Sequence, residues 1–251
     1  MSTEEVRSLM SAPGNDRLTW NTPLSEEHAA RLITACDPAP GARIADFGSG
    51  WGELLMRLVE AAPGATGDGI ETDPDAVARG RRLAEARGLA DRVRFYEVPA
   101  AEHREDGYDL VVCIGAAHAW PGGTADALKA LRAAVRPGGR VLFADGFWEC
   151  GPSAAALEGL GAAPDDFGSL LGLVRQAEAA GLRPLQVTVA DRREWDLFES
   201  AANIGRGERW ALAHPTHPLH AAVTAAVDAR RTGYYGGYRG TLGLAYLVLG
   251  T

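Results

Sequence analysis

The sequence alternates between short apolar runs and amphipathic segments, and this alternation constrains the fold more than any other feature. Seven segments have the length of strands, and residues 108–115 form a continuous apolar run. They lie at residues 43–47, 66–71, 92–98, 108–115, 140–147, 182–190 and 241–249. Segments with helical spacing connect most of them. Because strands joined by helical crossovers form a parallel sheet with helices on both faces, we predict an α/β, doubly wound sheet.

Two helix starts and one long connection complete the predicted organisation. Ser25 precedes a run of apolar residues at helical spacing. Asp73 followed by Pro74 is typical of a first helical turn, because aspartate caps it and proline is tolerated there. About fifty residues, 191–240, separate the last two strands. An unstructured loop of that length is uncommon in a compact domain, so we predict a mostly helical cap over the sheet.

Composition excludes several classes of function. With 46% hydrophobic and 23% charged residues, the chain has the composition of a globular protein. A formal net charge of -8 lacks the basic footprint of a nucleic-acid binder. Lys129 is the single lysine, which argues against Schiff-base and P-loop chemistry.

The longest apolar run is too short to span a membrane, and no signal pattern opens the chain. Three cysteines without a Cys-x-x-Cys spacing suit a reducing compartment. We therefore expect a cytoplasmic protein that acts on a small molecule, without a membrane or nucleic-acid partner.

The loop after the first predicted strand is rich in glycine. Gly48, Gly50 and Gly52 permit a tight turn and a close approach of the backbone to a ligand. The next helix points its first amide groups into the same space. In an open parallel sheet, ligands bind at the carboxyl ends of the strands. Glu71 ends the second strand, where its carboxylate can accept hydrogen bonds from a ribose diol.

These features favour a nucleoside ligand that is not a dinucleotide. The fingerprint Gly-x-Gly-x-x-Gly/Ala requires a small residue at position 53, where this chain has Glu53. A carboxylate there would repel a pyrophosphate, so a dehydrogenase is the least favoured enzyme class.

Three segments together resemble the class I S-adenosylmethionine-dependent methyltransferases of the small-molecule type. They are residues 40–52, residues 69–74 and residues 131–141, which contain Pro-Gly-Gly. The resemblance covers about residues 25–145. It implies a Rossmann-like methyltransferase fold whose seventh strand runs antiparallel beside the fifth, and S-adenosylmethionine as the cofactor.

The resemblance also implies roles for single residues. Asp46 would orient the amino end of the cofactor, Glu71 would hold the ribose hydroxyls, and the backbone at Ile114 would lie near the sulfonium. Gly48 and Gly50 would pack against the methionine and ribose portions. The cofactor-binding candidates are Asp46, Gly48, Ser49, Gly50, Glu71, Thr72, Ala100, Ala101 and Ile114.

The end of the third strand departs from the family pattern. Family members commonly have Gly-Asp-Ala where this chain has Val98-Pro99-Ala100, and that aspartate contacts the adenine amino group. Because Pro99 cannot make this contact, adenine recognition would fall on the backbone near Ala100 and Ala101, or on Glu102.

His118 follows the fourth predicted strand, at the edge where methyl donor and acceptor should meet. Methyl transfer from a sulfonium is an in-line displacement, so the protein mainly positions the reactants and excludes water. A base is needed only if the acceptor arrives protonated, and an imidazole titrates near neutral pH. His118 is the predicted catalytic base or substrate ligand. The alternative is a histidine that only caps its loop by hydrogen bonding.

Six of the eighteen aromatic residues lie in the predicted cap, which suits an apolar substrate pocket or the packing of the cap itself. Beside the fifth strand, Trp148 is either a pocket wall or a core residue, and Glu149 either binds a polar acceptor or is solvated. The substrate-binding candidates are His118, Trp148, Glu149, Trp195, Tyr234 and Tyr238. His214, His217 and His220 are spaced like metal ligands, but the intervening prolines prevent a regular helix, so no metal is predicted.

The predicted function is transfer of a methyl group to an oxygen, nitrogen or carbon of a small, apolar or aromatic metabolite. Two alternatives stay open: a cyclisation or lyase enzyme that uses the same cofactor, and a non-catalytic module that binds it. The expected domains are an N-terminal segment, residues 1–24, that closes over the cofactor, a Rossmann-like domain, residues 25–190 and 241–251, and a substrate cap, residues 191–240.

Overall fold

The chain, described by a computed structural model at residues 5–6, 9 and 18–251, divides into two compact units. The first, called here the sheet unit, comprises residues 25–146, 170–189 and 244–251. The second, the helical unit, comprises residues 147–169 and 190–243 together with the N-terminal stretch. Most of the segment predicted to close over the cofactor, residues 1–24, lies outside the described residues.

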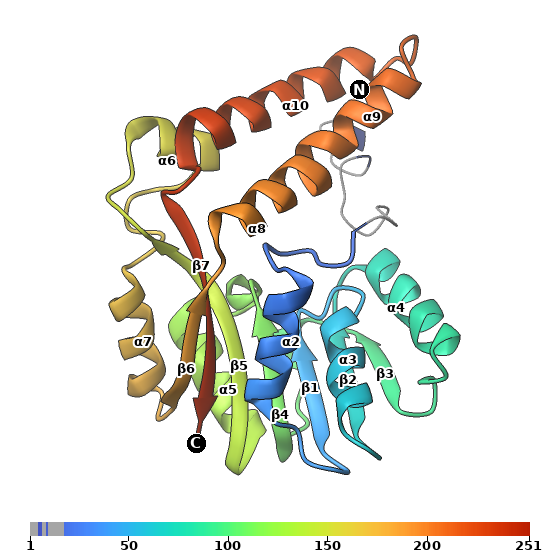
Figure 1. Ribbon diagram of the computed structural model, residues 1–251, viewed down its shortest axis with the longest axis vertical. Helices are drawn as coiled ribbons and strands as arrows, with labels where there is room; N and C mark the ends of the chain where they lie inside the picture. The colour runs from blue at the N-terminus through green and yellow to red at the C-terminus, as the bar shows by residue number, and fades with distance from the viewer. Residues whose placement is uncertain (1–4, 7–8, 10–17) are drawn as a thin grey trace. The chain divides into compact units, whose positions relative to one another are not determined.

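A seven-stranded sheet is the centre of the fold, in the order β3-β2-β1-β4-β5-β7-β6 (Figure 1). The strands are β1 (Arg43–Phe47), β2 (Thr66–Glu71), β3 (Val93–Glu97), β4 (Tyr108–Ile114), β5 (Val135–Trp148), β6 (Arg183–Val189) and β7 (Leu242–Gly250). The first five strands pair in parallel, whereas β6 and β7 pair antiparallel. The predicted Rossmann-like methyltransferase fold is therefore confirmed, including the antiparallel last strand.

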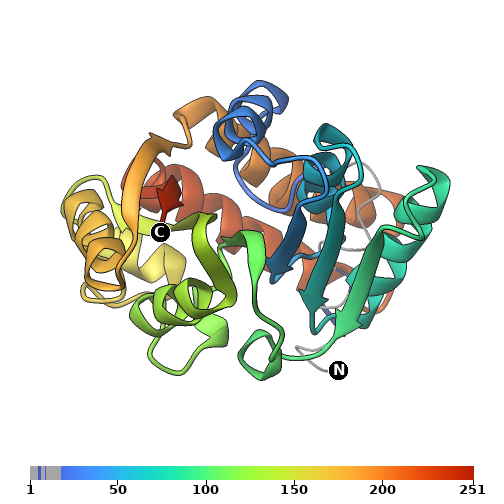
Figure 2. The same cartoon turned by 90° about the horizontal axis from the view of Figure 1, so that it is seen from below.

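Helices cover both faces of the sheet, with α2 and α3 on one face and α5 and α7 on the other (Figure 2). The helices of this unit are α2 (Glu26–Cys36), α3 (Glu53–Ala61), α4 (Pro74–Ala86), α5 (Thr124–Ala134) and α7 (Leu170–Ala179). Both predicted helix starts are present. Ser25 caps α2 by accepting a hydrogen bond from the amide of His28, and Asp73 caps α4 by accepting one from the amide of Asp75.

One face of the sheet is packed around Phe95, a buried residue of β3. A Cβ atom at Gly52 or at Gly80 would lie 2.6 Å from Cζ of this ring, and one at Gly69 would lie 2.8 Å from Cδ1. These glycines belong to the glycine-rich loop, to α4 and to β2. The Phe95 ring therefore fixes the glycine-rich loop against its neighbours, and only glycine leaves room for it.

Strand β5 begins earlier than the predicted residue 140. Val135 pairs with Tyr108 and Arg140 pairs with Leu110, so residues 136–139 bulge opposite Asp109. The Pro-Gly-Gly turn thus lies within the strand as a bulge instead of preceding it.

The helical unit confirms that residues 191–240 are mostly helical. Its elements are α6 (Ala154–Leu160), α8 (Arg192–Leu197), α9 (Gly205–Ala213), α10 (His220–Gly233) and the π-helical segments η4 (Phe198–Ile204) and η5 (Tyr234–Tyr238). Helix α6 is not predicted from the sequence. It has seven residues and too little apolar periodicity to stand out. Within the described part of the chain, no helix has the length and apolarity that a membrane crossing requires.

Candidate active site

The glycine-rich loop leaves β1 through three left-handed glycines. The φ angles of Gly48, Gly50 and Gly52 are 74°, 55° and 70°. A Cβ atom at Gly48 would lie only 2.3 Å from Cβ of Ala116, in the loop after β4. At Gly50 a Cβ atom would meet nothing within 4 Å. Gly48 therefore lets two loops pack closely, whereas Gly50 presents its backbone to open space where a ligand can lie.

The carboxyl end of β4 is open in the same way. Ile114 is half-buried and ends the strand, and Gly115 follows with a φ of 67°. A Cβ atom at Gly115 would also meet nothing within 4 Å. Since β1 and β4 are neighbouring parallel strands, Gly50 and Gly115 leave adjacent space at one edge of the sheet.

Glu71 is oriented toward this loop by backbone hydrogen bonds. Its Oε2 accepts a hydrogen bond from the amide of Gly50, at 2.8 Å. Its Oε1 accepts two, from Thr72 at 2.7 Å and from Asp73 at 3.0 Å. No arginine or lysine of the described chain pairs with it, and Oε2 retains a free lone pair. The carboxylate is thus held in place while it keeps acceptor capacity for a hydroxyl group.

Asp46 is a buried carboxyl group within β1, and its residue is 5% exposed. Burial mainly, and the nearby charge of Glu71 secondarily, raise its pKa to about 7. Among the described residues it has neither a hydrogen-bond donor nor a cation as partner. A buried carboxylate of this kind fits a ligand that brings its own positive charge, such as an ammonium group.

The surroundings of Glu53 weaken the predicted repulsion between this carboxylate and a pyrophosphate. The side chain is buried at the start of α3 and forms ion pairs with Arg57 and Arg87. Burial raises its pKa, but hydrogen bonds from Arg87 and Arg57 outweigh this effect and leave the pKa below its usual value. Glu53 therefore does not present an unpaired charge, and repulsion of a pyrophosphate is a weaker objection to a dinucleotide than predicted.

The loop after β3 forms a single 3₁₀ turn, η2 (Ala100–Glu102), which begins after Pro99. Ala100 is buried, Ala101 is half-buried and Glu102 is exposed. The carbonyl oxygen of Ala101 accepts a hydrogen bond from Arg104, at 2.6 Å. The Ala100 and Ala101 backbone and the Glu102 side chain thus stay the candidates for adenine recognition.

His118 lies in a second 3₁₀ turn, η3 (Ala117–Ala119), between β4 and α5. Its side chain is exposed and forms no hydrogen bond with any other described residue. The alternative that this histidine only caps its loop by hydrogen bonding therefore finds no support.

Two residues of the same region were not predicted from the sequence. They are Asp145, near the end of β5, and Thr124, at the start of α5, whose hydroxyl donates a hydrogen bond to Asp145. The sequence signal that could have identified Asp145 is an acidic residue near the carboxyl end of a predicted strand.

The remaining substrate candidates belong to the helical unit. The Nε1 of Trp148 donates a hydrogen bond to the carbonyl oxygen of Pro164, at 2.9 Å, so this half-buried ring has a structural contact. Glu149 is exposed, and its carboxylate stays a candidate for a polar acceptor. Trp195 is half-buried, with a buried Nε1 that has no acceptor in the described part of the chain.

Tyr234 and Tyr238 are core residues of the helical unit, each 1% exposed, and they cluster with Ala156 of α6. The hydroxyl of Tyr234 donates a hydrogen bond to Asp196, at 2.8 Å, and that of Tyr238 to Glu199, at 2.9 Å. Both rings therefore hold helices together, which is the packing role that the sequence analysis left open for the aromatic residues.

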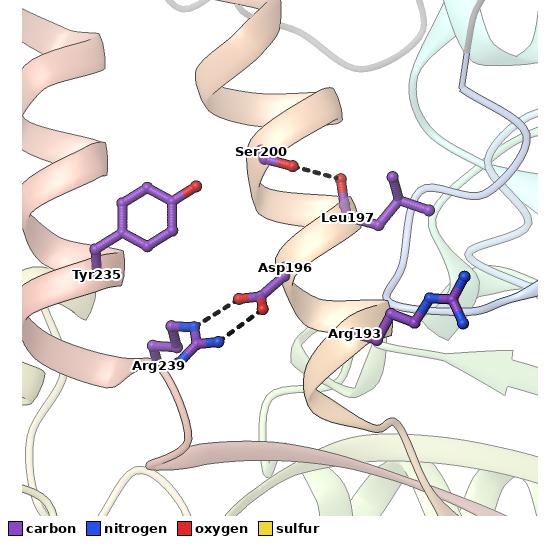
Figure 3. A pocket seen from close by; sticks show the side chains of 6 residues that line it. All are labelled: Arg193, Asp196, Leu197, Ser200, Tyr235 and Arg239. Carbon is purple, nitrogen blue, oxygen red and sulfur yellow. Dashed lines mark hydrogen bonds and ion pairs between the residues drawn. The ribbon is translucent and has the colours of Figure 1, made fainter.

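A pocket on the helical unit was not predicted. It is lined by Arg193, Asp196, Leu197, Ser200, Tyr235 and Arg239 (Figure 3). Asp196 accepts two hydrogen bonds from Arg239, at 2.6 and 2.8 Å, and these bonds above all lower its pKa to about 2. The Tyr235 ring on the facing wall is half exposed. The ion pair satisfies the charges of Asp196 and Arg239, so the pocket offers a ligand the phenol ring of Tyr235 and the exposed guanidinium of Arg193.

Other contacts occupy two of the three histidines at 214, 217 and 220, although the rings of His214 and His217 lie 6.2 Å apart. His214 stacks on Trp210 and its Nδ1 donates a hydrogen bond to the Trp210 carbonyl oxygen, and Nδ1 of His217 accepts one from the amide of Leu219. Over the described residues, no three His, Cys, Asp or Glu side chains are grouped so that they could hold a metal ion.

Comparison of this chain with known proteins identifies its family. A sequence profile described as a methyltransferase domain matches residues 45–141. The Escherichia coli protein YjhP is 32% identical over 212 residues, which is 83% of this chain and 84% of YjhP. A Geobacter sulfurreducens S-adenosylmethionine-dependent methyltransferase, crystallised with S-adenosylhomocysteine, is 28% identical with a TM-score of 0.86 over 98% of this chain and 97% of that one. This chain belongs to the class I S-adenosylmethionine-dependent methyltransferases.

Two further findings support this placement. The crystal structure of YjhP has a TM-score of 0.84 over 96% of this chain and 98% of YjhP. Mouse acetylserotonin O-methyltransferase is 30% identical over 200 residues, 78% of this chain but only 46% of that enzyme. This methyltransferase is therefore an enzyme of the small-molecule type, and S-adenosylmethionine is its cofactor. The residues at the carboxyl edge fit that cofactor, because open glycines adjoin one oriented and one buried carboxylate.

Proposed function

We propose that this methyltransferase transfers the methyl group to an oxygen of a small hydroxylated, apolar or aromatic molecule, and that His118 accepts the hydroxyl proton. The observation that carries this proposal is the exposed imidazole in η3, which has no hydrogen bond to a described residue and follows the open backbone at Gly115. The resemblance to an O-methyltransferase supports oxygen as the acceptor atom.

In the same proposal, residues of the sheet unit hold the cofactor. S-adenosylmethionine supplies a methyl group that is already activated by a sulfonium centre. Asp46 binds the ammonium group at its amino acid end, because a buried carboxylate without a partner gains most from a cation. Glu71 accepts hydrogen bonds from the ribose hydroxyls, with Ser49 and Thr72 beside it. The backbone at Ala100 and Ala101 recognises the adenine, and that at Ile114 lies near the sulfur.

His118 acts once an acceptor is bound. S-adenosylmethionine, when bound, would supply the methyl group to the acceptor oxygen, and an imidazole nitrogen of His118 would accept the hydroxyl proton. Because a positioned base typically contributes about 10²- to 10⁴-fold to such a step, replacing His118 should lower kcat by that order.

The test is a screen of small phenols and alcohols, each paired with the same molecule lacking the hydroxyl group, with formation of S-adenosylhomocysteine as the readout. Product with the hydroxylated member alone supports the proposal. His118→Gln should then lose turnover and keep its affinity for S-adenosylhomocysteine, whereas His214→Gln, an exposed histidine in the helical unit, should retain activity. Full turnover by His118→Gln would contradict the role of His118 as base.

A further inference from the structure

Asp145 lies beside the loop that carries His118. Strands β4 and β5 pair so that Ile114 faces Ala144, and the amide of Gly115 donates a hydrogen bond to the carbonyl oxygen of Ala144, at 2.8 Å. Asp145 is the next residue of β5, and the loop from Gly115 to His118 leaves β4 at the same level. The strand register thus brings an acid and the proposed base to one end of two neighbouring strands.

The Asp145 carboxylate is oriented by two hydrogen bonds. Oδ2 accepts one from Oγ1 of Thr124, the first residue of α5, at 2.6 Å. Oδ1 accepts one from the amide of Gly146, at 2.8 Å. Neither donor is charged, and Asp145 forms no ion pair with an arginine or lysine of the described chain. The carboxylate is therefore fixed in direction, yet its negative charge is not neutralised.

A positive charge on the His118 imidazole would attract this carboxylate. Burial raises the pKa of Asp145, while the hydrogen bonds from Thr124 and Gly146 and the charge of His118 lower it. No hydrogen bond joins the two side chains, so the interaction acts through the electric field, which is strong where a group is partly buried. Sequence position alone does not reveal this relation, because 27 positions separate the two residues.

We propose that Asp145, oriented by Thr124, is a positioning residue that stabilises the protonated imidazole of His118 while the acceptor loses its proton. This inference rests on the proposed role of His118 as base. As the hydroxyl proton moves to the imidazole, a positive charge forms there, and the fixed carboxylate of Asp145 is already in place to attract it. The carboxylate itself neither gains nor loses a proton.

The electrostatic relation is tested without any substrate. Aspartate labelled with ¹³C at the carboxyl carbon allows the pKa of Asp145 to be measured by NMR, with Asp145→Asn to assign the signal. In His118→Gln the pKa of Asp145 should rise, because the attraction of the imidazolium is lost. Asp46, whose pKa is also raised but on which only Glu71 acts, provides the matched control and should not move. An unchanged titration of Asp145 would overturn the inference.

Kinetics with an acceptor found in the screen test the catalytic consequence. Asp145→Asn should lower kcat at least tenfold and leave the affinity for S-adenosylhomocysteine unchanged. Thr124→Val should lower kcat to a smaller extent, and Thr124→Ser should restore it because serine keeps the hydroxyl group. The control is Asp91→Asn, an exposed aspartate just before β3, at the opposite ends of the strands. Full turnover by Asp145→Asn would overturn the inference while leaving His118 as base, whereas full turnover by His118→Gln would overturn both.

Discussion

The carboxylate of Glu71 illustrates how one side chain both builds the site and recognises the ligand. It accepts hydrogen bonds from the amides of Gly50 and Thr72, and so ties the glycine-rich loop to the end of β2. The same carboxylate faces the space that Gly50 leaves open. Its loss is therefore expected to affect cofactor binding directly and the shape of the loop indirectly.

Glu71→Gln keeps the size of the side chain but removes its charge. Charge-assisted hydrogen bonds to a ribose contribute more than neutral ones, so binding of S-adenosylhomocysteine should weaken by about 1–3 kcal/mol, roughly 5- to 150-fold. The matched control is Glu97→Gln. Glu97 is exposed and lies opposite Glu71 in the register of β2 and β3, at the end of the neighbouring strand. Calorimetry should show a loss of affinity for S-adenosylhomocysteine in Glu71→Gln only. Equal affinities would contradict the placement of the ribose.

The buried carboxyl group of Asp46 makes stability depend on pH. Its pKa is raised by burial from 3.8 to about 7. Between these values the folded protein keeps a proton that the unfolded chain has lost, so raising the pH through this window removes stability. Asp46→Asn lacks this titration. The free energy of unfolding of the variant, relative to the natural protein, should therefore increase between pH 4.5 and pH 7.5. Urea denaturation at both pH values measures it, and a constant difference would contradict the burial of an unpaired acid.

At the scale of the elements, the Phe95 ring joins β3 to β2, to α4 and to the glycine-rich loop. An alanine in place of a helical glycine is ordinarily stabilising, by about 1 kcal/mol. At Gly80 the new methyl group would lie 2.6 Å from the ring, and a Cβ atom at Gly52 or Gly69 would lie nearly as close to it. The ring is therefore closely surrounded, so it has little room to make way for an added methyl group.

Gly80→Ala should therefore destabilise the protein by about 1–3 kcal/mol, the usual cost of overpacking. Adding Phe95→Leu should recover part of this loss, so the double-mutant cycle shows coupling. The control is Gly236→Ala in η5, where the added methyl group meets nothing within 4 Å and should change stability little. Urea denaturation of the four variants tests this, and additive effects would contradict the packing argument.

The helical unit depends on an ion pair in which the carboxylate of Glu199 is fully buried and the Arg230 side chain is half-buried. Glu199 of η4 is 0% exposed and accepts hydrogen bonds from Arg230 of α10, at 2.7 and 2.9 Å, and from the hydroxyl of Tyr238 in η5. Removing one partner of such a pair leaves a charge without compensation, which typically costs about 3–5 kcal/mol. Arg230→Gln, which removes the cation from the fully buried carboxylate of Glu199, should destabilise the protein on this scale. Asp196→Asn, which breaks an exposed pair with Arg239, should cost little. Similar losses of stability for the two variants, in thermal or urea unfolding, would contradict the account.

The elements that the sequence predicts well are those with local signals. Helix α4 starts where Asp73 and Pro74 predict it, and β2 has the predicted bounds because only a short segment lies between the Pro63-Gly64 turn and Asp73. The bulge of β5 depends on pairing with β4, and helix α6 is stabilised by contacts with η5 and α10. Neither has a local signal that the chain displays before it folds.

The same difference between local signals and contacts made on folding applies to the candidate site. Glu71 and the glycine-rich loop were predicted because a motif of adjacent residues specifies them. Asp145 was missed because its relation to His118 arises from the register of two strands. Tyr234 and Tyr238 were predicted to bind substrate but lie in the core of the helical unit, because aromatic enrichment does not distinguish a pocket from a core.

At the scale of the whole molecule, the residues assigned to the cofactor all belong to one compact unit. Asp46, Glu71, Ala100 and Ile114 lie on four strands or their loops in the sheet unit, at the carboxyl ends where ligands of open α/β sheets bind. The helical unit is assembled from separate stretches of the chain and contains the aromatic candidates. The proposal therefore assigns cofactor binding to residues of the sheet unit.

Calorimetric titration of the purified protein with S-adenosylhomocysteine and, in parallel, with NAD tests the central claim most directly. The account predicts binding of one equivalent of S-adenosylhomocysteine and no heat with NAD. The open backbone at Gly50 and Gly115 and the carboxylates of Asp46 and Glu71, neither of which pairs with a cation of the described chain, suit the first ligand. Binding of NAD, or no binding of S-adenosylhomocysteine, would contradict the assignment of this sheet edge as the cofactor site.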